Sequence, residues 1–182
     1  VQTMSVSGNS DGEVEYTIIP SASSCQGESI IYTYQIQALP VVTNNPAKQK
    51  LCSGMNFPAV NLTANMSNIV IHWQVISGSS LGVSHLSGTG TLPEETLTNP
   101  AHEPDTVIYR IYAVRTDGLN CNGPDFYYYR IIKSLPDVFV TPTSQQICPG
   151  TSTSIQLSST THPGQATFSW EVAANDLGAF SS

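Results

Sequence analysis

The sequence predicts an all-β protein built from tandem repeats of about 96 residues. Two observations predict this fold class. Short runs rich in Val, Ile, Thr and Tyr alternate with clusters of Gly, Pro, Asn and Ser along the 182-residue chain, which is the pattern of strands separated by turns. A set of landmark residues also recurs further along the chain at a nearly constant distance, which indicates an internal repeat.

The repeat is carried by six groups of residues that recur in the same order 93 to 97 positions later. The pairs are Val14–Ile18 with Val107–Ile111, Cys25 with Cys121, Leu39-Pro40 with Leu135-Pro136, Leu51–Gly54 with Ile147–Gly150, Trp73–Val75 with Trp170–Val172, and Leu81-Gly82 with Leu177-Gly178. Such a period suits one immunoglobulin-like β-sandwich of about 100 residues. We therefore expect the C-terminal half of one repeat (1–43), a complete repeat (44–141) and the N-terminal half of a third (142–182). Both ends fall inside the pattern, so we expect a segment of a longer protein.

In the complete repeat, alternation of apolar and polar residues predicts strands over 59–64, 69–76, 107–114 and 126–133. Side chains two positions apart share a face of a strand. Trp73 is therefore expected to point inward with its apolar neighbours, and Tyr109 likewise. Trp170, the counterpart of Trp73, is expected in the core of the third repeat. The short linkers at Leu39-Pro40 and Leu135-Pro136 predict stiff coupling between neighbouring repeats.

Composition excludes several function classes. Charged residues make up only 10% of the chain, and six Lys plus Arg against thirteen Asp plus Glu give a net charge of −7. No basic patch for nucleic acid can be assembled from so few cations. There is no apolar run near 18 residues, so direct membrane insertion is not expected. No nucleophile and base at catalytic spacing, no paired carboxylates and no phosphate loop are recognisable, which predicts no catalytic residues and no cofactor.

The landmarks resemble a known family. The run Ile147-Cys148-Pro149-Gly150-Thr151, followed by Trp170, together with Tyr109, Cys121 and Gly123, is similar to the PKD-like repeats of very large Bacteroidota surface proteins. These proteins are exported by type IX secretion and include the SprB-type gliding-motility adhesins. The resemblance covers essentially the whole chain and implies extension, display and adhesion. Two features depart from the family pattern, namely residues 55–58 and the long Gly/Ser-rich loop 77–91.

The four cysteines are of two kinds, because Cys52 and Cys148 precede a glycine turn while Cys25 and Cys121 lie in hairpin loops. One of each kind per repeat predicts disulfides in an extracellular protein. We expect Cys52 to pair with Cys121, and Cys25 and Cys148 to pair outside the segment. The alternative is a ladder of bonds between adjacent repeats, because the two hairpin ends of a sandwich can lie too far apart for an internal bond. Zinc is the rival use of these cysteines, but no Cys/His spacing supports it.

Other candidate sites are weaker. Tyr127 and Tyr129 could form an exposed aromatic strip for sugar or protein contact, although cross-strand packing also accounts for them. The acidic region 94–105 could bind calcium, but it lacks regularly alternating oxygen ligands, so no metal site is predicted. Asp105-Thr106-Val107 resembles the Bacteroidota O-glycosylation acceptor, which makes Thr106 a candidate glycosylation site. The sequons at Asn61 and Asn65 carry no weight in a bacterial protein.

These observations predict a non-catalytic segment of a large secreted adhesin, located outside the cell at the outer-membrane surface. The expected partners are neighbouring repeats of the same chain, surface polysaccharide and other cell-surface proteins. The alternative is a carbohydrate-binding or spacer module of an exported polysaccharide-degrading enzyme.

Overall fold

A computed structural model describes residues 2–44 and 46–172, and all regular structure in these residues is β. Thirteen strands follow one another in these described residues. They are β1 (Gly12–Ile18), β2 (Ser21–Ala22), β3 (Cys25–Gln26), β4 (Ile30–Ile36), β5 (Gln49–Cys52), β6 (Asn56–Phe57), β7 (Ile69–Ser77), β8 (Ser87–Thr89), β9 (Glu95–Thr96), β10 (Asp105–Arg115), β11 (Phe126–Lys133), β12 (Phe139–Thr141) and β13 (Gln156–Ser158). The all-β prediction is therefore confirmed.

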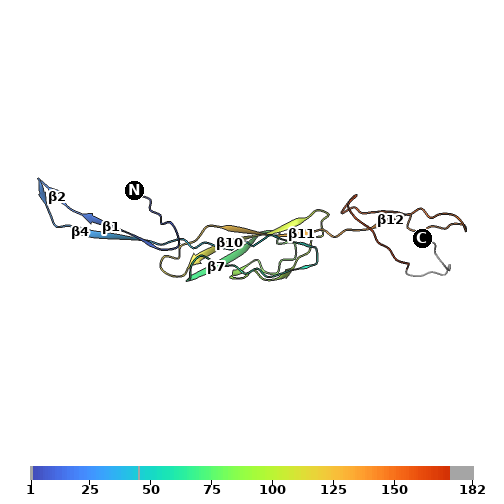
Figure 1. Ribbon diagram of the computed structural model, residues 1–182, viewed down its shortest axis with the longest axis horizontal. Coiled ribbons are helices and arrows are strands. Elements are labelled where there is room, and N and C mark those ends of the chain that lie inside the picture. The colour runs from blue at the N-terminus through green and yellow to red at the C-terminus, as the bar shows by residue number, and fades with distance from the viewer. Residues whose placement is uncertain (1, 45, 173–182) are drawn as a thin grey trace.

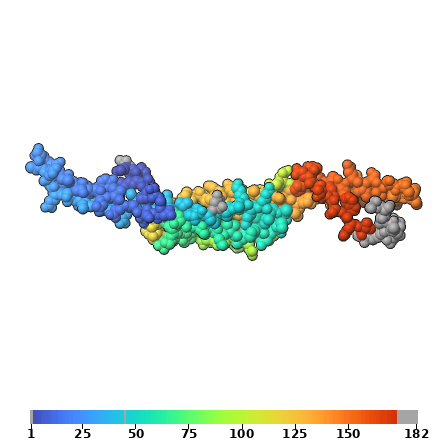
Figure 2. Space-filling model, viewed as in Figure 1, coloured from blue at the N-terminus to red at the C-terminus, as the bar shows by residue number. Residues whose placement is uncertain are grey.

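The molecule is elongated, with three parts arranged in chain order along its longest axis (Figures 1 and 2). The N-terminal hairpin, formed by β1 and β4 with β2 and β3 at its tip, projects from one end. The middle unit, residues 46–134, carries the largest sheet. The C-terminal segment, residues 137–172, carries β12 and β13 at the opposite end (Figure 1).

The middle unit is built on a five-stranded sheet in the order β5-β11-β10-β7-β8. Neighbouring strands in this sheet are antiparallel except β5, which runs parallel to β11. The short ladder of β6 with β9 and the bridge between Val60 and Leu92 form a second layer. The two layers enclose one hydrophobic core, an arrangement consistent with a β-sandwich.

Period-2 alternation accounts for the central strand. The burial of β10 alternates along its whole length, with Val107, Tyr109, Ile111 and Ala113 each 0% exposed. Trp73 on the neighbouring β7 is 5% exposed, and its ring meets that of Tyr109 edge-on at 6.1 Å between centroids. The expected core positions of Trp73 and Tyr109 are therefore confirmed.

Gly88 lets β8 pair beside Trp73. A Cβ atom at this position would lie 2.5 Å from a carbon of the indole ring, so any other residue would displace the ring. The expected strand over 59–64 is wrong, because only the isolated bridges at Val60 and Ala64 form there. This segment crosses the open face of the sheet, and its apolar side chains contribute to the core without a continuous ladder.

A buried ion pair joins the two layers of the middle unit. Arg130 on β11 and Glu95 on β9 have side chains 0% and 1% exposed, and Arg130 Nη1 lies 3.3 Å from Glu95 Oε2. The Tyr109 hydroxyl donates to the same carboxylate oxygen at 2.9 Å. Arg130 also donates to Gln49 Oε1 and to the carbonyls of Pro58 and Pro93. The Arg130 guanidinium therefore makes hydrogen bonds to residues of both layers of the middle unit.

The N-terminal hairpin repeats the pairing of the hairpin formed by β10 and β11. Tyr16 lies opposite Tyr32 in the first, and Tyr109 lies opposite Tyr128 in the second. The same shifts, 93 residues in the first strand and 96 in the second, relate the remaining partners. The internal repeat of the sequence thus reappears as an identical strand register.

Trp170 does not lie in a core. It is 81% exposed, and Val172 beside it is 61% exposed. In the middle unit, Trp73 is covered because β7 joins β10 and lies under the second layer. Among residues 137–172, no such sheet and second layer surround Trp170. The expected core position is therefore not formed, although the sequence correspondence with Trp73 stands.

The buried ion pair generates a stability prediction. In Glu95→Ala, Arg130 remains in the core without a counter-charge, so we expect a loss of about 3–5 kcal/mol in the free energy of unfolding. As a control, Asp125→Ala removes the exposed partner of Arg110, a pair at 2.9 Å with side chains 38% and 34% exposed. The control should lose less than about 1 kcal/mol. Urea unfolding followed by tryptophan emission, which changes as the buried Trp73 becomes exposed, measures both. Equal losses would contradict a core role for the pair.

Candidate functional site

The most elaborate polar site joins the N-terminal hairpin to the middle unit. Arg115, the last residue of β10, is only 8% exposed and donates to two carboxylates from different parts of the chain. Its Nη1 lies 2.5 Å from Asp11 Oδ1, and its Nε lies 2.8 Å from Asp117 Oδ1. Asp11 Oδ1 also accepts the backbone N–H of Ala38 at 2.8 Å. We call Arg115, Asp11 and Asp117 the arginine clamp.

Charge pairing shifts the pKa values within the clamp. The Arg115 guanidinium holds the pKa values of both Asp11 and Asp117 below their usual range, chiefly by hydrogen bonding. Hydrogen bonds to Asp117 and Asp11 raise the pKa of Arg115. All three groups are therefore charged at neutral pH. The carboxylates of Asp11 and Asp117 bind the buried Arg115 guanidinium together, from opposite sides of the boundary.

The loop 117–123 closes the same boundary by backbone contact. Gln37 receives the N–H of Leu119 on its side-chain oxygen at 3.0 Å. Gly123 approaches the carbonyl oxygen of Pro40 so closely that a Cβ atom there would lie 1.7 Å from it. Only glycine permits this approach, so the turn chemistry of the loop serves the contact between the two parts.

The linkers on both sides of the middle unit make the same type of hydrogen bond. The N–H of Val41 donates to Asn65 Oδ1 at 2.7 Å, and the N–H of Asp137 donates to Thr161 Oγ1 at 3.0 Å. Each position in the second bond follows its counterpart by 96 residues. Hydrogen bonds from Ser159, Thr160 and Thr161 lower the pKa of Asp137. Each linker is thus held to the part that follows it.

The cysteines do not form the expected bond, and the prediction of a Cys52–Cys121 disulfide is wrong for this structure. All four, including Cys25 and Cys148, are free thiols. Cys52 pairs with Lys133 at the end of β11, whereas Cys121 lies in the loop at the other end of the hairpin. About nine strand residues separate the two ends, or roughly 30 Å, and a disulfide requires Cα atoms within about 7 Å.

Each cysteine of the middle unit lies near a boundary instead. The Cys121 thiol lies 3.6 Å from the side-chain oxygen of Gln37, which belongs to the end of the N-terminal hairpin. Cys52 lies beside Lys133, immediately before the linker to the C-terminal segment. The alternative, a ladder of bonds between adjacent repeats, stays a prediction. No pair within the described residues is bonded.

The outer face of the large sheet carries an aromatic strip, which we define as His72, Tyr112, Tyr127 and Tyr129. Tyr127 is 44% exposed, and the ammonium of Lys48 lies 4.5 Å above the ring of Tyr129. The rings of His72 and Tyr112 stack at 5.5 Å. Cross-strand packing therefore accounts for part of the strip, while Tyr127 remains open to solvent.

Thr106 lies on the same outer side of β10, next to the buried Val107, and is partly exposed. Its N–H donates to the carboxylate of Asp105. The hydroxyl is thus on a surface that a glycan could occupy, and O-glycosylation at Thr106 stays a prediction.

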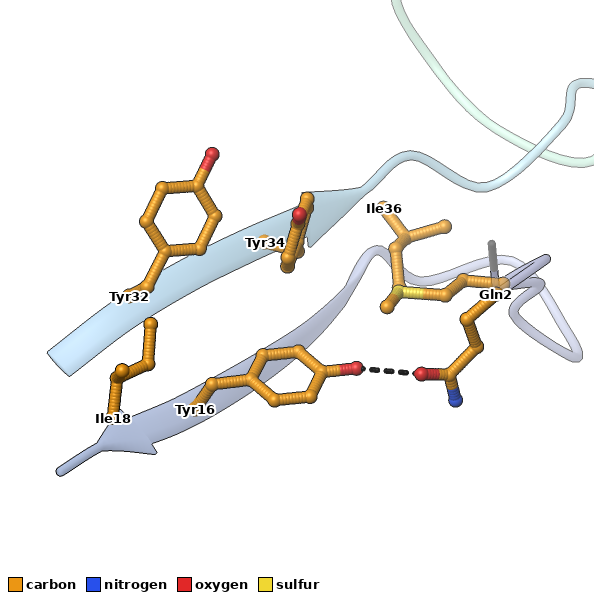
Figure 3. A pocket seen from close by; sticks show the side chains of 7 residues that line it. Gln2, Tyr16, Ile18, Tyr32, Tyr34 and Ile36 are labelled. Atoms are coloured by element: carbon orange, nitrogen blue, oxygen red, sulfur yellow. Dashed lines mark hydrogen bonds between the residues drawn. The ribbon is translucent and has the colours of Figure 1, made fainter. Parts of the chain in front are cut away.

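A hollow with a volume of about 550 Å³ lies on one face of the N-terminal hairpin. Figure 3 shows aromatic and aliphatic side chains of both strands facing it, and one hydrogen bond from the Tyr16 hydroxyl to Gln2. The lining residues are Gln2, Met4, Tyr16, Ile18, Tyr32, Tyr34 and Ile36. The surface is mainly apolar, and no Asp, Glu, His, Lys or Arg lines it.

No group of three or more His, Cys, Asp or Glu side chains that could hold a metal ion occurs in residues 2–44 and 46–172. In the acidic region 94–105, Glu95 is bound to Arg130 and to the N–H groups of Ser84 and His85, which removes it from any cation site. The same residues contain no helix that is long and apolar enough to cross a membrane.

Sequence reasoning missed the residues that hold the parts together. Arg130 shares the inward face of its strand with Tyr128 and Ile132, so the period-2 pattern alone could have marked it as a buried cation. Glu95 carried no such signal, because it lies in a short strand within an irregular stretch. The arginine clamp also had no local signal, since Asp11 and Arg115 are 104 residues apart.

Comparisons with known proteins leave this geometry without a relative: no family model, no curated protein and no solved structure matches the chain.

The clamp predicts a pH-dependent boundary. Because the folded pKa values of Asp11 and Asp117 are lowered, their contribution is present above the ordinary carboxyl pKa of about 3.9 and is lost as pH falls through the lower folded values. We expect hydrogen exchange at the Ala38 amide to be protected at neutral pH and, after correction for intrinsic exchange rates, less protected below about pH 4.

Arg115→Ala should remove that protection already at neutral pH, whereas Arg110→Ala, which breaks an exposed pair on the same strand, should leave it unchanged. Protection of Ala38 that does not respond to Arg115→Ala would show that the boundary is held by backbone contacts alone.

The cysteine geometry gives a second prediction. Because Cys52 and Cys121 lie at opposite ends of the middle unit, reduction should leave the melting temperature of the isolated chain unchanged. Cys52→Ser should change the free energy of unfolding by no more than a surface substitution does, about 0.5 kcal/mol. Calorimetry with and without reductant measures this. A reductant-dependent drop of many degrees, absent in Cys52→Ser, would restore the bond within the repeat.

Proposed function

We propose that the chain is a non-catalytic segment of a tandem array of immunoglobulin-like, PKD-like repeats, divided at 1–43, 44–141 and 142–182, and that the array is a stiff spacer in a secreted cell-surface adhesin. The proposal rests on one observation: the three parts lie end to end, and hydrogen bonds hold each linker to the part that follows it. A spacer must hold its ends apart, and a linker with few free residues does so better than a flexible one.

Three further observations support a structural role. The strand register of the N-terminal hairpin is repeated in the middle unit, as in an array of similar units. The arginine clamp and the Gly123 contact restrict bending at the first boundary. Cys52 and Cys121 lie near the two boundaries of the middle unit, where bonds between consecutive repeats would lock the array covalently in an oxidising environment. Gliding motility is the context in which the resemblance to SprB-type adhesins places such a filament.

The alternative function, a carbohydrate-binding module of an exported polysaccharide-degrading enzyme, is favoured by one observation. Tyr127 on the aromatic strip is 44% exposed on the outer face of the large sheet. Exposed aromatic rings are suitable platforms for the apolar faces of sugar rings. The strip is compact and partly self-stacked, so this remains the second candidate.

Small-angle X-ray scattering on dilute chain tests the spacer. A rod of three parts in line predicts a maximum dimension on the order of 100 Å, from strand lengths of about 3.3 Å per residue. Arg115→Ala combined with Gly123→Ala should broaden the distance distribution through bending at the first boundary. Leu86→Lys, an exposed substitution away from both boundaries, is the control. A wild-type profile as broad as that of the double variant would sink the proposal.

A glycan array with Tyr127→Ala as the matched variant tests the alternative. Binding of the wild type to a polysaccharide, lost in Tyr127→Ala while the scattering profile stays the same, would favour the carbohydrate-binding module over the spacer.

A further inference from the structure

The N-terminal hairpin and the middle unit present different side chains on their outward sides. In the middle unit, the positions that alternate with the buried ones on β10 and β11 hold Thr106, Ile108, Arg110, Tyr127, Tyr129 and Ile131. The corresponding positions of the hairpin, 93 residues earlier on β1 and 96 earlier on β4, hold Glu13, Glu15, Thr17, Ile31, Thr33 and Gln35. The same strand register therefore presents a mainly apolar and aromatic surface in one part and a polar, acidic surface in the other.

These outward sides are independent of the cores. The second layer of the middle unit packs on the inward side of the sheet, around Tyr109 and Tyr128, and leaves Tyr127 44% exposed on the other side. In the hairpin, the hollow of Figure 3 lies on the inward side. Glu15 precedes the lining residue Tyr16 on β1, so it points the opposite way. What covers the inward side of a hairpin therefore does not change what its outward side presents.

The exposed cations gather on the outward side of the middle unit. The chain has six Lys plus Arg, of which Arg115 and Arg130 are buried. The others all lie on this side of the sheet, and they are Lys48, Lys50, Arg110 and Lys133. Arg110 is paired with Asp125 at 2.9 Å. Within residues 2–44 and 46–172, Lys48 and Lys50 have no carboxylate partner.

The unpaired charges of the two outward sides match in spacing. Lys50 on β5 lies beside Ile131, and the ammonium of Lys48, two residues earlier, lies over the ring of Tyr129. Glu13 and Glu15 are also two residues apart, on β1, and both are exposed. Two residues span about 6.6 Å along a strand, so the two carboxylates can meet the two ammonium groups at once. We call the outward side of β5, β10 and β11 the basic face, and the outward side of β1 and β4 the acidic face.

We propose that the acidic face of one copy packs against the basic face of a second copy, so that neighbouring arrays associate side by side with an offset of one repeat. The end of β10 meets the start of β1 at the first boundary, so these two strands run in the same direction. Because β5 runs opposite to β10, β1 of a parallel copy is antiparallel to β5. Glu13 is then level with Lys50, and Glu15 is level with Lys48.

Electrostatics favour this pairing over a contact between two like faces. Each chain carries a net charge of −7, so copies repel one another except where opposite charges are brought together. Two basic faces in contact would oppose their lysines, whereas the basic and acidic faces neutralise each other. Tyr127 and Ile31, 44% and 63% exposed, lie at the same level and supply apolar area to the contact.

The inference goes beyond the spacer role, because a spacer requires no second copy. The scattering test on dilute chain reports bending at the first boundary and is independent of it. A chain that is stiff but does not associate contradicts the pairing alone, and a chain that associates but bends contradicts the spacer alone.

Sedimentation velocity from micromolar to submillimolar concentration, at low and at high salt, tests the pairing. We expect the weight-average sedimentation coefficient to rise with concentration at low salt. The rise should be smaller at high salt, because salt screens charges at an exposed contact. A chain that stays monomeric at low salt, or one whose association does not respond to salt, overturns the proposal.

Charge reversal identifies the two faces. The variant with Lys48→Glu and Lys50→Glu and the variant with Glu13→Lys and Glu15→Lys change exposed side chains, and each should associate more than about tenfold more weakly than the wild type. One chain that carries all four substitutions exchanges the charges between the faces and keeps the net charge of −7. It should associate as the wild type does, and a failure to recover overturns the pairing.

Two single variants and one added polymer separate this contact from others. Glu28→Lys, at the tip of the hairpin, and Ile18→Lys, on its inward side, should associate as the wild type does. A loss of association in Ile18→Lys would move the contact to the inward side and overturn the proposal. If the chain stays monomeric but binds polygalacturonate, and loses that binding in the Lys48→Glu, Lys50→Glu variant, the basic face belongs to an acidic polysaccharide and not to a second copy.

Discussion

The middle unit depends on one buried cation. The guanidinium of Arg130 reaches the carboxylate of Glu95, Gln49 Oε1 and the carbonyls of Pro58 and Pro93, which come from segments that otherwise share few hydrogen bonds. Burial raises the pKa of Tyr109, so its hydroxyl stays protonated and donates to the same carboxylate. Since the second layer has only a two-residue ladder, these directional bonds fix where it lies on the sheet.

The same constraint explains how related repeats can differ. At the position of Arg130, the N-terminal hairpin has Tyr34, and the hairpin register is nevertheless unchanged. Register is set by the alternation of inward and outward residues, whereas the choice of covering layer depends on whether a charge must be neutralised. A second layer without a carboxylate would leave the charge of Arg130 unpaired, whereas a tyrosine at the same position requires no counter-charge.

The sequence was sufficient for features that depend on period and spacing. The strand over 126–133, the alternating face of Tyr109 and the inward position of Trp73 all follow from period-2 patterns. It failed where a partner is remote, as with Glu95 and Arg115. The Cys52–Cys121 bond failed for a related reason, because spacing along the chain does not tell that β5 runs parallel to β11 and carries Cys52 to the far end.

Mechanical load along the long axis would pass through the linkers, since they join consecutive parts of the rod. At the first boundary, load meets the arginine clamp, in which a largely buried cation holds acidic groups from both sides. At the second, Asp137 accepts hydrogen bonds from the hydroxyls of Ser159, Thr160 and Thr161 and is not paired with a cation among the described residues. Ionic contacts weaken with salt and at low pH, whereas hydroxyl–carboxylate bonds are less sensitive to salt. The two boundaries therefore differ in which solution conditions loosen them, and the first should bend before the second as salt rises.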